Sequence, residues 1–325
     1  MNNNTLISVL IIAYQNVPGI YDALDSIFLQ NYPEIEIVIS DDGTPGFEEH
    51  IAQLNQYIKE HAGSNIKNVV INAIKVNGGT VKSINSALKC SQGKYIFTLA
   101  ADDKFARKDS LDIFRNYLVQ NRQMVVFSKI RGIHADGTYK YEFEAVKSNF
   151  QLLQTYTAEQ IQNRLFSKNF LPGCAVFMDR EVFEKYGYFP EEIRLIEDYP
   201  YWLILSRHGE RFGFIDQVLI ECKLEGVSSS GNYSETFMND MQVIYDKYIF
   251  PYDKRFGICQ PLYNMLKQGG LNYYKAKASW SSMTKKQRAT VWLKYGIFHI
   301  YTRIQSFRNQ YKNKSIIKEM KNVNH

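Results

Sequence analysis

The sequence predicts an α/β fold with a mostly parallel sheet, followed by a helical C-terminal region. Short apolar runs, each typical of a buried strand, alternate with amphipathic segments in the N-terminal part of the chain. Polar residues follow these runs where parallel strands would end, and ligands bind at that edge of such sheets. From about Ser234 onward the pattern is helical, without strand alternation.

The first elements repeat strand, loop and helix, which indicates a sheet covered on both faces. The strands are expected at Leu6 to Ala13, Ile35 to Ile39 and Asn68 to Ile74, and in the run from Lys94 that ends at Asp102 and Asp103. The helices are expected after Pro18, over Phe47 to His61, and after Asn77-Gly78-Gly79. Pro near a helix start and Gly in the turns agree with this assignment.

Beyond residue 124 the elements become more varied. Strands are expected at Met124 to Ile130, Leu171 to Met178 and Phe212 to Leu224, and helices at Gln151 to Phe166, Arg180 to Tyr186 and Tyr199 to Ser206. Asp136-Gly137 is a hairpin signal, and residues 227–231 form a small polar loop. The predicted organisation is an α/β domain over 1–225, divided near residue 130, and a helical region over 226–325.

The composition and the charge distribution argue against some classes of function. The chain has 325 residues, of which 45% are hydrophobic and 22% charged, as in ordinary globular proteins. The net charge of +6 is concentrated after residue 284, where ten Lys or Arg accompany a single acid, Glu319. The body is therefore close to neutral, which argues against nucleic-acid binding.

Cysteine usage and the N-terminus suggest a reduced, intracellular environment. The four cysteines lie far apart and none forms a Cys-x-x-Cys pair, so neither a zinc site nor a disulfide framework is expected. The N-terminus lacks the basic start and cleavage site of a signal peptide. No long window of apolar residues is free of charge, so no transmembrane helix is expected.

The acidic pairs carry the functional argument. Asp102 and Asp103 end one apolar run, and Asp41-Asp42-Gly43 ends another. Two adjacent carboxylates at the end of a buried strand are costly unless a cation or a hydrogen-bonding ligand joins them. Glu197-Asp198 precedes an apolar helix, and a helix N-terminus favours an ionised carboxylate.

In combination, these motifs resemble the family 2 inverting glycosyltransferases of the GT-A fold. The matching segments are Ser8 to Asn16, Ser40 to Thr44, Asn77-Gly78-Gly79 with Lys82 and Asn85, Gly93 to Ile96 with Asp102-Asp103, and Glu197-Asp198. They occur in the family's order over residues 6 to about 225. No Gln-x-x-Arg-Trp motif follows, so the resemblance implies addition of one sugar and not polymerisation.

The resemblance implies roles for the donor-binding residues. Tyr14 would stack on the base of a nucleotide-sugar, most simply a UDP-sugar, and Asp42 would accept a hydrogen bond from the uracil N–H. Lys82 would reach the phosphates, and Asp102 would bind ribose or sugar hydroxyls. Asp103 would hold Mn²⁺ or Mg²⁺, which are hard cations that prefer oxygen ligands and neutralise charge on a departing diphosphate.

For the acceptor half, the resemblance implies that Asp198 is the general base. An inverting transfer needs a carboxylate that takes the proton of the acceptor hydroxyl as its oxygen attacks. Glu197 and the turn at Gly173 would lie beside the acceptor. The resemblance implies that this acceptor is a glycan or a lipid-linked sugar. Plainer interpretations stay open: Asp42 as a turn residue and Asp198 as a helix cap.

The basic tail permits two interpretations. Apolar residues recur at helical spacing between Val291 and Tyr311, namely Ile297, Ile300, Tyr301, Ile304, Phe307 and Tyr311. Such a helix can lie on an anionic membrane surface, where lipid-linked acceptors reside. It can equally pack on the catalytic domain or on a second copy of the chain. A cytoplasmic protein, with or without contact to the inner membrane face, is expected in either case.

Other function classes are weighed against the transferase. A sugar nucleotidyltransferase would carry a Gly-rich, basic signature after the first strand, which Tyr14 to Ile20 does not offer. A dehydrogenase would carry Gly-x-Gly-x-x-Gly. A catalytically inactive sugar- or nucleotide-binding subunit of a polysaccharide assembly complex remains an alternative, although the acids at 42, 102, 103 and 198 are all present.

Overall fold

The computed structural model describes residues 5–133, 139–142, 153–223, 234–278, 280–296, 298 and 300. Its strands are β1 Ile7–Ala13, β2 Ile35–Asp41, β3 Ile66–Ala73, β4 Tyr95–Ala100, β5 Lys104–Phe105, β6 Val125–Ile133, β7 Tyr139–Glu142, β8 Val176–Asp179 and β9 Gly213–Lys223. Its helices are α1 Val17–Phe28, α2 Phe47–His61, α3 Thr80–Cys90, α4 Ser110–Asn121, α6 Ala158–Leu165, α7 Glu181–Tyr186, α8 Asp198–Arg207, α9 Glu235–Val243 and α10 Gln260–Ala278. Shorter helical turns are η1 Gly173–Ala175, η2 Ile244–Ile249, η3 Gly257–Cys259 and η4 Trp280–Ser282.

One mixed sheet organises the molecule, in the order β3-β2-β1-β4-β8-β6-β9-β5, with β7 paired to β6. The pairs β1–β2, β1–β4 and β2–β3 are parallel, as the strand-loop-helix repeat predicted. The strand β8 lies between β4 and β6 and runs antiparallel to both, so one strand in the middle of the sheet is reversed. Polar residues that follow β1, β2 and β4 consequently meet at one edge.

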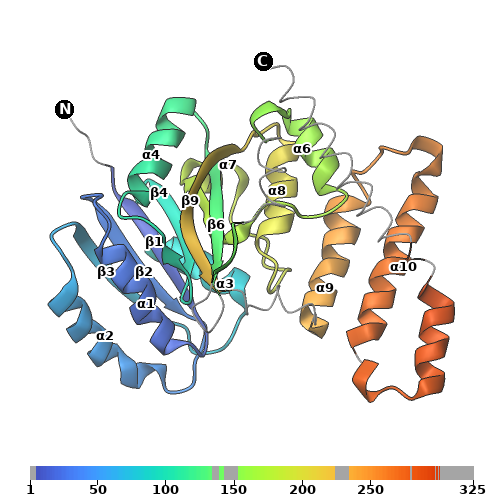
Figure 1. The fold of residues 1–325 in the computed structure, drawn as a ribbon, viewed down its shortest axis with the longest axis horizontal. Helices are drawn as coiled ribbons and strands as arrows, with labels where there is room; N and C mark the ends of the chain where they lie inside the picture. Colours follow the sequence, from blue (N-terminus) through green and yellow to red (C-terminus); the bar gives the residue numbers. More distant parts are fainter. Residues whose placement is uncertain are drawn as a thin grey trace.

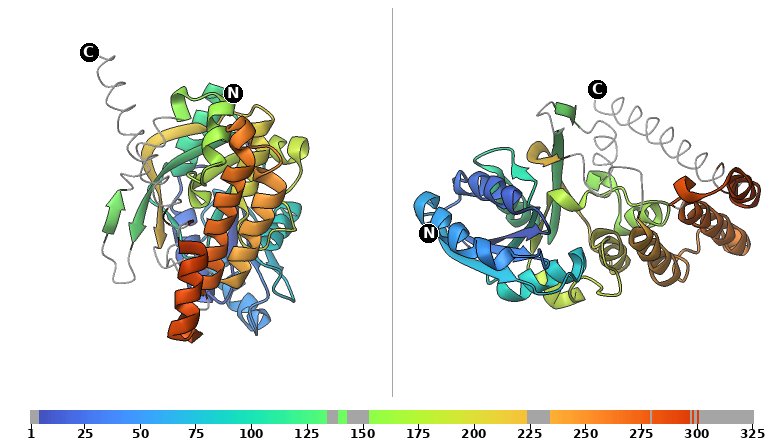
Figure 2. Two further views of the ribbon diagram at one scale, coloured as in Figure 1. Left: turned by 90° about the vertical axis from the view of Figure 1, so that its right-hand side faces the viewer. Right: turned by 90° about the horizontal axis from the view of Figure 1, so that it is seen from below.

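Two apolar layers hold helices against the two faces of the sheet. Alternate residues of a strand point to opposite faces, so Leu10 and Ile96 join one cluster, whereas Val9 and Phe97 join the other. The first cluster receives α3, α6 and α8, and the second receives α1, α2 and α4. Helix α9 lies next to α8, and α10 lies on the outer side of α9, at the end of the molecule away from β3 (Figure 1, Figure 2).

Two predicted elements differ in detail. The strand expected over Leu171 to Met178 begins only at Val176, because the chain first makes the helical turn η1 after Pro172. The helix expected over Gln151 to Phe166 is interrupted. Thr157 begins α6 there with a capping box, in which its side chain accepts from Gln160 N and its own N–H donates to the Gln160 side chain.

The described part of the C-terminal region, from residue 234 onward, contains helices joined by turns and no strand, as predicted. No helix among the described residues is long and apolar enough to cross a membrane. Phe298 packs on α10, since a Cβ placed on Gly269 would lie 2.4 Å from its ring. In contrast, Trp292, Leu293 and Ile300 are at least half exposed. The predicted hairpin at Asp136-Gly137, the loop at 227–231 and the tail beyond residue 300 lie outside the described residues.

Candidate active site

Asp42 forms a cradle with the loop that enters α3. Its Oδ1 accepts a hydrogen bond from Gly78 N at 2.9 Å, and its Oδ2 accepts from Gly79 N at 2.8 Å and from Asn77 Nδ2 at 2.9 Å. The side chain is almost fully buried. An ionised carboxylate offers about four acceptor positions, so roughly one remains for a ligand.

Tyr14 and Lys82 flank this cradle. The Tyr14 ring is 46% exposed just after β1, and the following residue, Gln15, is tied through its N–H to Thr44 Oγ1 at 2.7 Å. Lys82 is exposed on α3, and its aliphatic stem lies against Gly78, where an added Cβ would be 3.1 Å from it. The structure thus leaves one aromatic ring and one ammonium group accessible beside Asp42.

Glu197 and Asp198 form a half-buried carboxylate pair at the start of α8. Asp198 Oδ2 accepts from Asn169 Nδ2 at 2.8 Å, and its Oδ1 accepts from Tyr199 N at 2.6 Å. Burial raises the pKa of Asp198, although these hydrogen bonds oppose the rise. Burial and the charge of Asp198 raise the pKa of Glu197. The pair therefore tends to keep a proton on Glu197 while Asp198 is the stronger acid.

Gly173 packs directly on this pair. A Cβ at this position would lie 3.2 Å from Asp198 Cβ and 3.2 Å from Glu197 Oε1. The same residues line a small pocket together with Ile84, Thr98, Val176, Met178, Phe189 and Trp202. The predicted acceptor residues Gly173 and Glu197 are therefore brought together with Asp198.

Two positioning residues, Arg194 and Asp240, were not found from the sequence. Asp240 of α9 accepts hydrogen bonds from the N–H groups of residues 194, 195 and 196, at 3.0, 2.6 and 3.3 Å. Arg194 Nη2 donates to Asn77 O at 3.1 Å, and its carbonyl accepts from Val81 N at 3.2 Å. The C-terminal helices thus fix the segment before Glu197 and join it to the Asp42 cradle.

Close packing at Gly79 explains why the cradle requires glycine. This residue has φ +91°, a backbone conformation that L side chains rarely adopt, and an added Cβ would lie 2.5 Å from Arg194 O. A Gly-Gly turn before a helix was the only sequence signal for this approach, and it did not indicate that residue 194 was the partner.

Asp102 and Asp103 have different surroundings although they are adjacent. Asp102 is half-buried, and no hydrogen bond links its side chain to another residue of the described chain. Asp103 is almost fully buried, and its Oδ1 accepts from Lys223 N at 3.2 Å. Burial and the charge of Asp102 raise the pKa of Asp103 to about 7.

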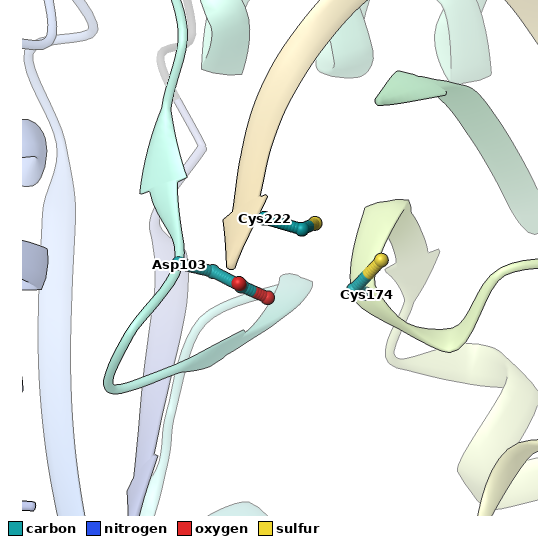
Figure 3. A group of neighbouring side chains, drawn as sticks. All are labelled: Asp103, Cys174 and Cys222. Carbon is teal, nitrogen blue, oxygen red and sulfur yellow. The ribbon is translucent and has the colours of Figure 1, made fainter. Parts of the chain in front are cut away.

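Two thiols accompany Asp103. The Cys174 and Cys222 sulfurs and a carboxylate oxygen of Asp103 all lie within 4.8 Å of one another. Figure 3 shows the side chains of Asp103, in the loop between β4 and β5, and of Cys222, on β9, pointing toward the segment with Cys174. Cys174 follows Gly173, so this cluster joins the acidic pair after β4 to the Glu197–Asp198 pair. The wide sequence spacing of the cysteines gave no sign of this grouping.

A chain of contacts connects several of the predicted residues. Asp42 reaches Asn77, Asn77 contacts Arg194, and the segment from Arg194 leads to Asp198. From Asp198, contacts continue through Gly173 to the thiols beside Asp103. The loop after β2 is thereby joined to the half-buried Glu197–Asp198 pair and to the small pocket beside it.

Comparisons with known proteins agree with this geometry. The family model described as glycosyl transferase family 2 matches residues 8–187, more than half of the chain. The chain belongs to this family, and its fold is GT-A.

Two curated relatives illustrate the range of the family. An uncharacterised glycosyltransferase of Rickettsia prowazekii is 24% identical over 229 residues, which are 69% of this chain and 66% of the relative. The poly(ribitol-phosphate) beta-glucosyltransferase of Bacillus spizizenii is 27% identical over 216 residues, 63% of this chain and 33% of the relative. The chain thus spans just under two thirds of the first relative and about a third of the second.

Two solved structures show the same fold. TarS 1-349 of S. aureus, solved in complex with UDP-GlcNAc, superposes with a TM-score of 0.57 at 19% identity, covering 97% of this chain and 92% of that one. The mannosyltransferase PcManGT of Pyrobaculum calidifontis, in complex with GDP-Man and Mn²⁺, has a TM-score of 0.56 at 16% identity, covering 97% of this chain and 88% of that one.

Proposed function

We propose that this protein is an inverting glycosyltransferase that moves one sugar from a nucleotide-sugar to a hydroxyl group of a glycan or lipid-linked acceptor. The observation that carries the proposal is the connected path from the Asp42 cradle through Arg194 to the half-buried Asp198. A donor site and a candidate base are thereby held in one rigid frame. The family membership and the sugar transfer stated in the relatives' names support the same reaction class.

The donor is proposed to be a UDP-sugar. Asp42 has about one acceptor position left, which suits the single N–H of uracil. Tyr14 offers an exposed ring for stacking on the base, and Lys82 offers a positive charge to the phosphates. The two solved neighbours were crystallised with different nucleotides, UDP-GlcNAc and GDP-Man, so the base preference rests on Asp42.

The residues at the end of β4 fit a divalent cation. Asp102 carries a half-buried carboxylate without a hydrogen-bonding partner among the described residues, and hard cations take such oxygen ligands together with substrate phosphates. Asp103, the ligand expected from the sequence, is turned toward two thiols and Lys223 N. We therefore assign the phosphate-facing role to Asp102 and place Asp103 behind it. A bound Mn²⁺ or Mg²⁺ would neutralise charge on the departing diphosphate.

Asp198 is proposed to take the proton of the acceptor hydroxyl. Asn169 Nδ2 and Tyr199 N hold its two oxygens, so its orientation is set before the substrate binds. Glu197, which tends to be protonated, can donate a hydrogen bond to the acceptor while Gly173 leaves room beside it. A small pocket lined by Gly173, Glu197 and Asp198 lies next to this pair.

The test is donor turnover by the full chain. UDP-, GDP- and CDP-sugars are incubated with Mn²⁺ or Mg²⁺, and nucleoside diphosphate release is measured with and without saccharide acceptors. We expect release from a UDP-sugar, loss of release in Asp102→Asn and Asp198→Asn, and normal release in Asp246→Asn, an exposed carboxylate in η2. Tight UDP binding without any turnover would instead favour the inactive, nucleotide-binding subunit.

A further inference from the structure

Beside the proposed donor site lies a cluster of one carboxylate and two thiols, and thiols are poor ligands for Mg²⁺ or Mn²⁺. Asp103, Cys174 and Cys222 come from the loop after β4, from η1 and from the end of β9, and their ligand atoms lie within 4.8 Å of one another. We propose that Asp103, Cys174 and Cys222 form a binding site for a thiophilic divalent cation, Zn²⁺ in the first place. This site is separate from the one assigned to Asp102, and its existence does not depend on the transferase reaction.

The ligand types match zinc. Zn²⁺ accepts thiolate and carboxylate ligands, with Zn–S of about 2.3 Å and Zn–O of about 2.0–2.2 Å in tetrahedral sites. That geometry needs ligand atoms roughly 3.5–3.8 Å apart. The present separations, at most 4.8 Å, therefore require only side-chain adjustments of about 1 Å. Mg²⁺ and Mn²⁺ prefer oxygen ligands and would gain little from two sulfurs.

The electrostatic surroundings also favour a cation. Asp103 is only 5% exposed, and buried carboxylates are usually paired or metal-bound. No salt bridge reaches it within the described part of the chain. The nearest cationic residue, Lys223, gives Asp103 its backbone N–H, while its ammonium lies 4.0 Å from Asp22 Oδ2. The carboxylate is therefore left with a neighbouring acid and two thiols.

The site has an entry path and an open position. Cys174 is partly exposed, whereas Cys222 is buried. Binding as thiolates would release one proton from each cysteine to solvent and leave the fourth zinc position to water. Because Cys174 follows Gly173 and Asp103 follows Asp102, an ion here would tie the acceptor-side turn to the end of β4.

The experiment measures metal binding by the reduced, full-length chain. Cd²⁺ serves as the probe because cadmium–thiolate bonds absorb in the ultraviolet, and Zn²⁺ is then added as competitor. We expect one bound Cd²⁺ with two thiolates per chain, displaced by Zn²⁺ but not by excess Mg²⁺. Cys174→Ser and Cys222→Ser should each lower the affinity at least about tenfold. Asp103→Asn should weaken binding but keep the two-thiolate absorption.

Cys90→Ser is the matched control, since Cys90 is a partly exposed thiol on α3 outside the cluster. Circular dichroism and a UDP-dependent thermal shift verify that each variant is folded. Unchanged Cd²⁺ absorption in both cluster variants, equal loss in Cys90→Ser, or a Cys174–Cys222 disulfide with no metal binding after reduction would overturn the proposal. Because the readout is absorption, failure of the transferase activity would not be mistaken for failure of the metal site.

Discussion

Asp42 and Asp103 both follow a central strand and are almost equally buried, with 3% and 5% exposure, yet their surroundings differ. Asp42 receives two backbone N–H groups and an amide, whereas Asp103 receives one backbone N–H and lies beside two thiols and Asp102. Burial raises the pKa values of Glu197 and Asp198 as well. Equal burial of two carboxylates therefore does not give them equal surroundings, and what each can bind depends on the groups that face it.

The largest effect is expected on the rate of transfer, when the proposed base Asp198 is replaced. Asp198→Asn keeps the shape of the side chain and its place beside Asn169, but removes the base. We expect kcat for transfer to fall by about 10²- to 10⁴-fold while UDP affinity stays within a factor of about two. Steady-state kinetics and calorimetric titration of UDP measure the two quantities. A parallel loss of UDP affinity would mean that Asp198 belongs to the donor side.

The next largest effect is expected at Asp42, in the proposed donor site. Asp42→Ala leaves the N–H groups of Gly78 and Gly79 and the amide of Asn77 without their acceptor. We expect the free energy of unfolding to fall by about 1–3 kcal/mol for each donor left buried and unpaired, and UDP binding to weaken. Urea denaturation gives the stability, with Asp246→Asn as a control. Unchanged stability would show that the cradle is filled by water and does not depend on Asp42.

A smaller effect is expected at Asp240 of α9, which holds the segment before Glu197 in place. In Asp240→Asn, the retained oxygen can still accept from the N–H groups of residues 195 and 196, and only the bond to Arg194 N is lost. We expect a loss of about 1–3 kcal/mol in unfolding free energy and a fall in kcat of roughly tenfold through misplacement of Asp198. The pH optimum should not move, because Asp240 does not exchange protons with the substrate. A shifted optimum would give Asp240 a more direct role.

The smallest effect is a pH dependence of stability from Asp103. Its pKa is raised from 3.8 to about 7, so the folded state holds the proton more tightly than the unfolded chain does. Protonated Asp103 makes its full contribution to the free energy of unfolding below about pH 4, and this contribution is lost as the pH rises through about 7. With metals chelated, we expect the wild type to lose about 1–2 kcal/mol relative to Asp103→Asn between about pH 6 and 8. A difference that does not change with pH would contradict this environment.

Several parts of the fold followed from local pattern. The apolar runs predicted β1, β2 and β4 because a strand buried on both faces is nearly all apolar. The helix after Asn77-Gly78-Gly79 and the helix after Asp198 were likewise predicted, within a residue or two. The strand expected over Leu171 to Met178 was wrong in its first half, because the apolar residues there are as typical of a strand as of the buried helical turn η1.

The sequence by itself determined the residue types at the ends of the strands, and with them the chemistry of carboxylates, an exposed aromatic ring and a lysine at one sheet edge. Only the tertiary structure decided which of these groups meet. The path from Asp42 to Arg194, the support of Asp240 for the Asp198 segment, and the grouping of Asp103 with Cys174 and Cys222 all join positions far apart in the chain. Such contacts arise where the segment before α8 meets the start of α3 and the helix α9, and where β5, β9 and η1 pack together. Local propensity holds no information about this long-range packing.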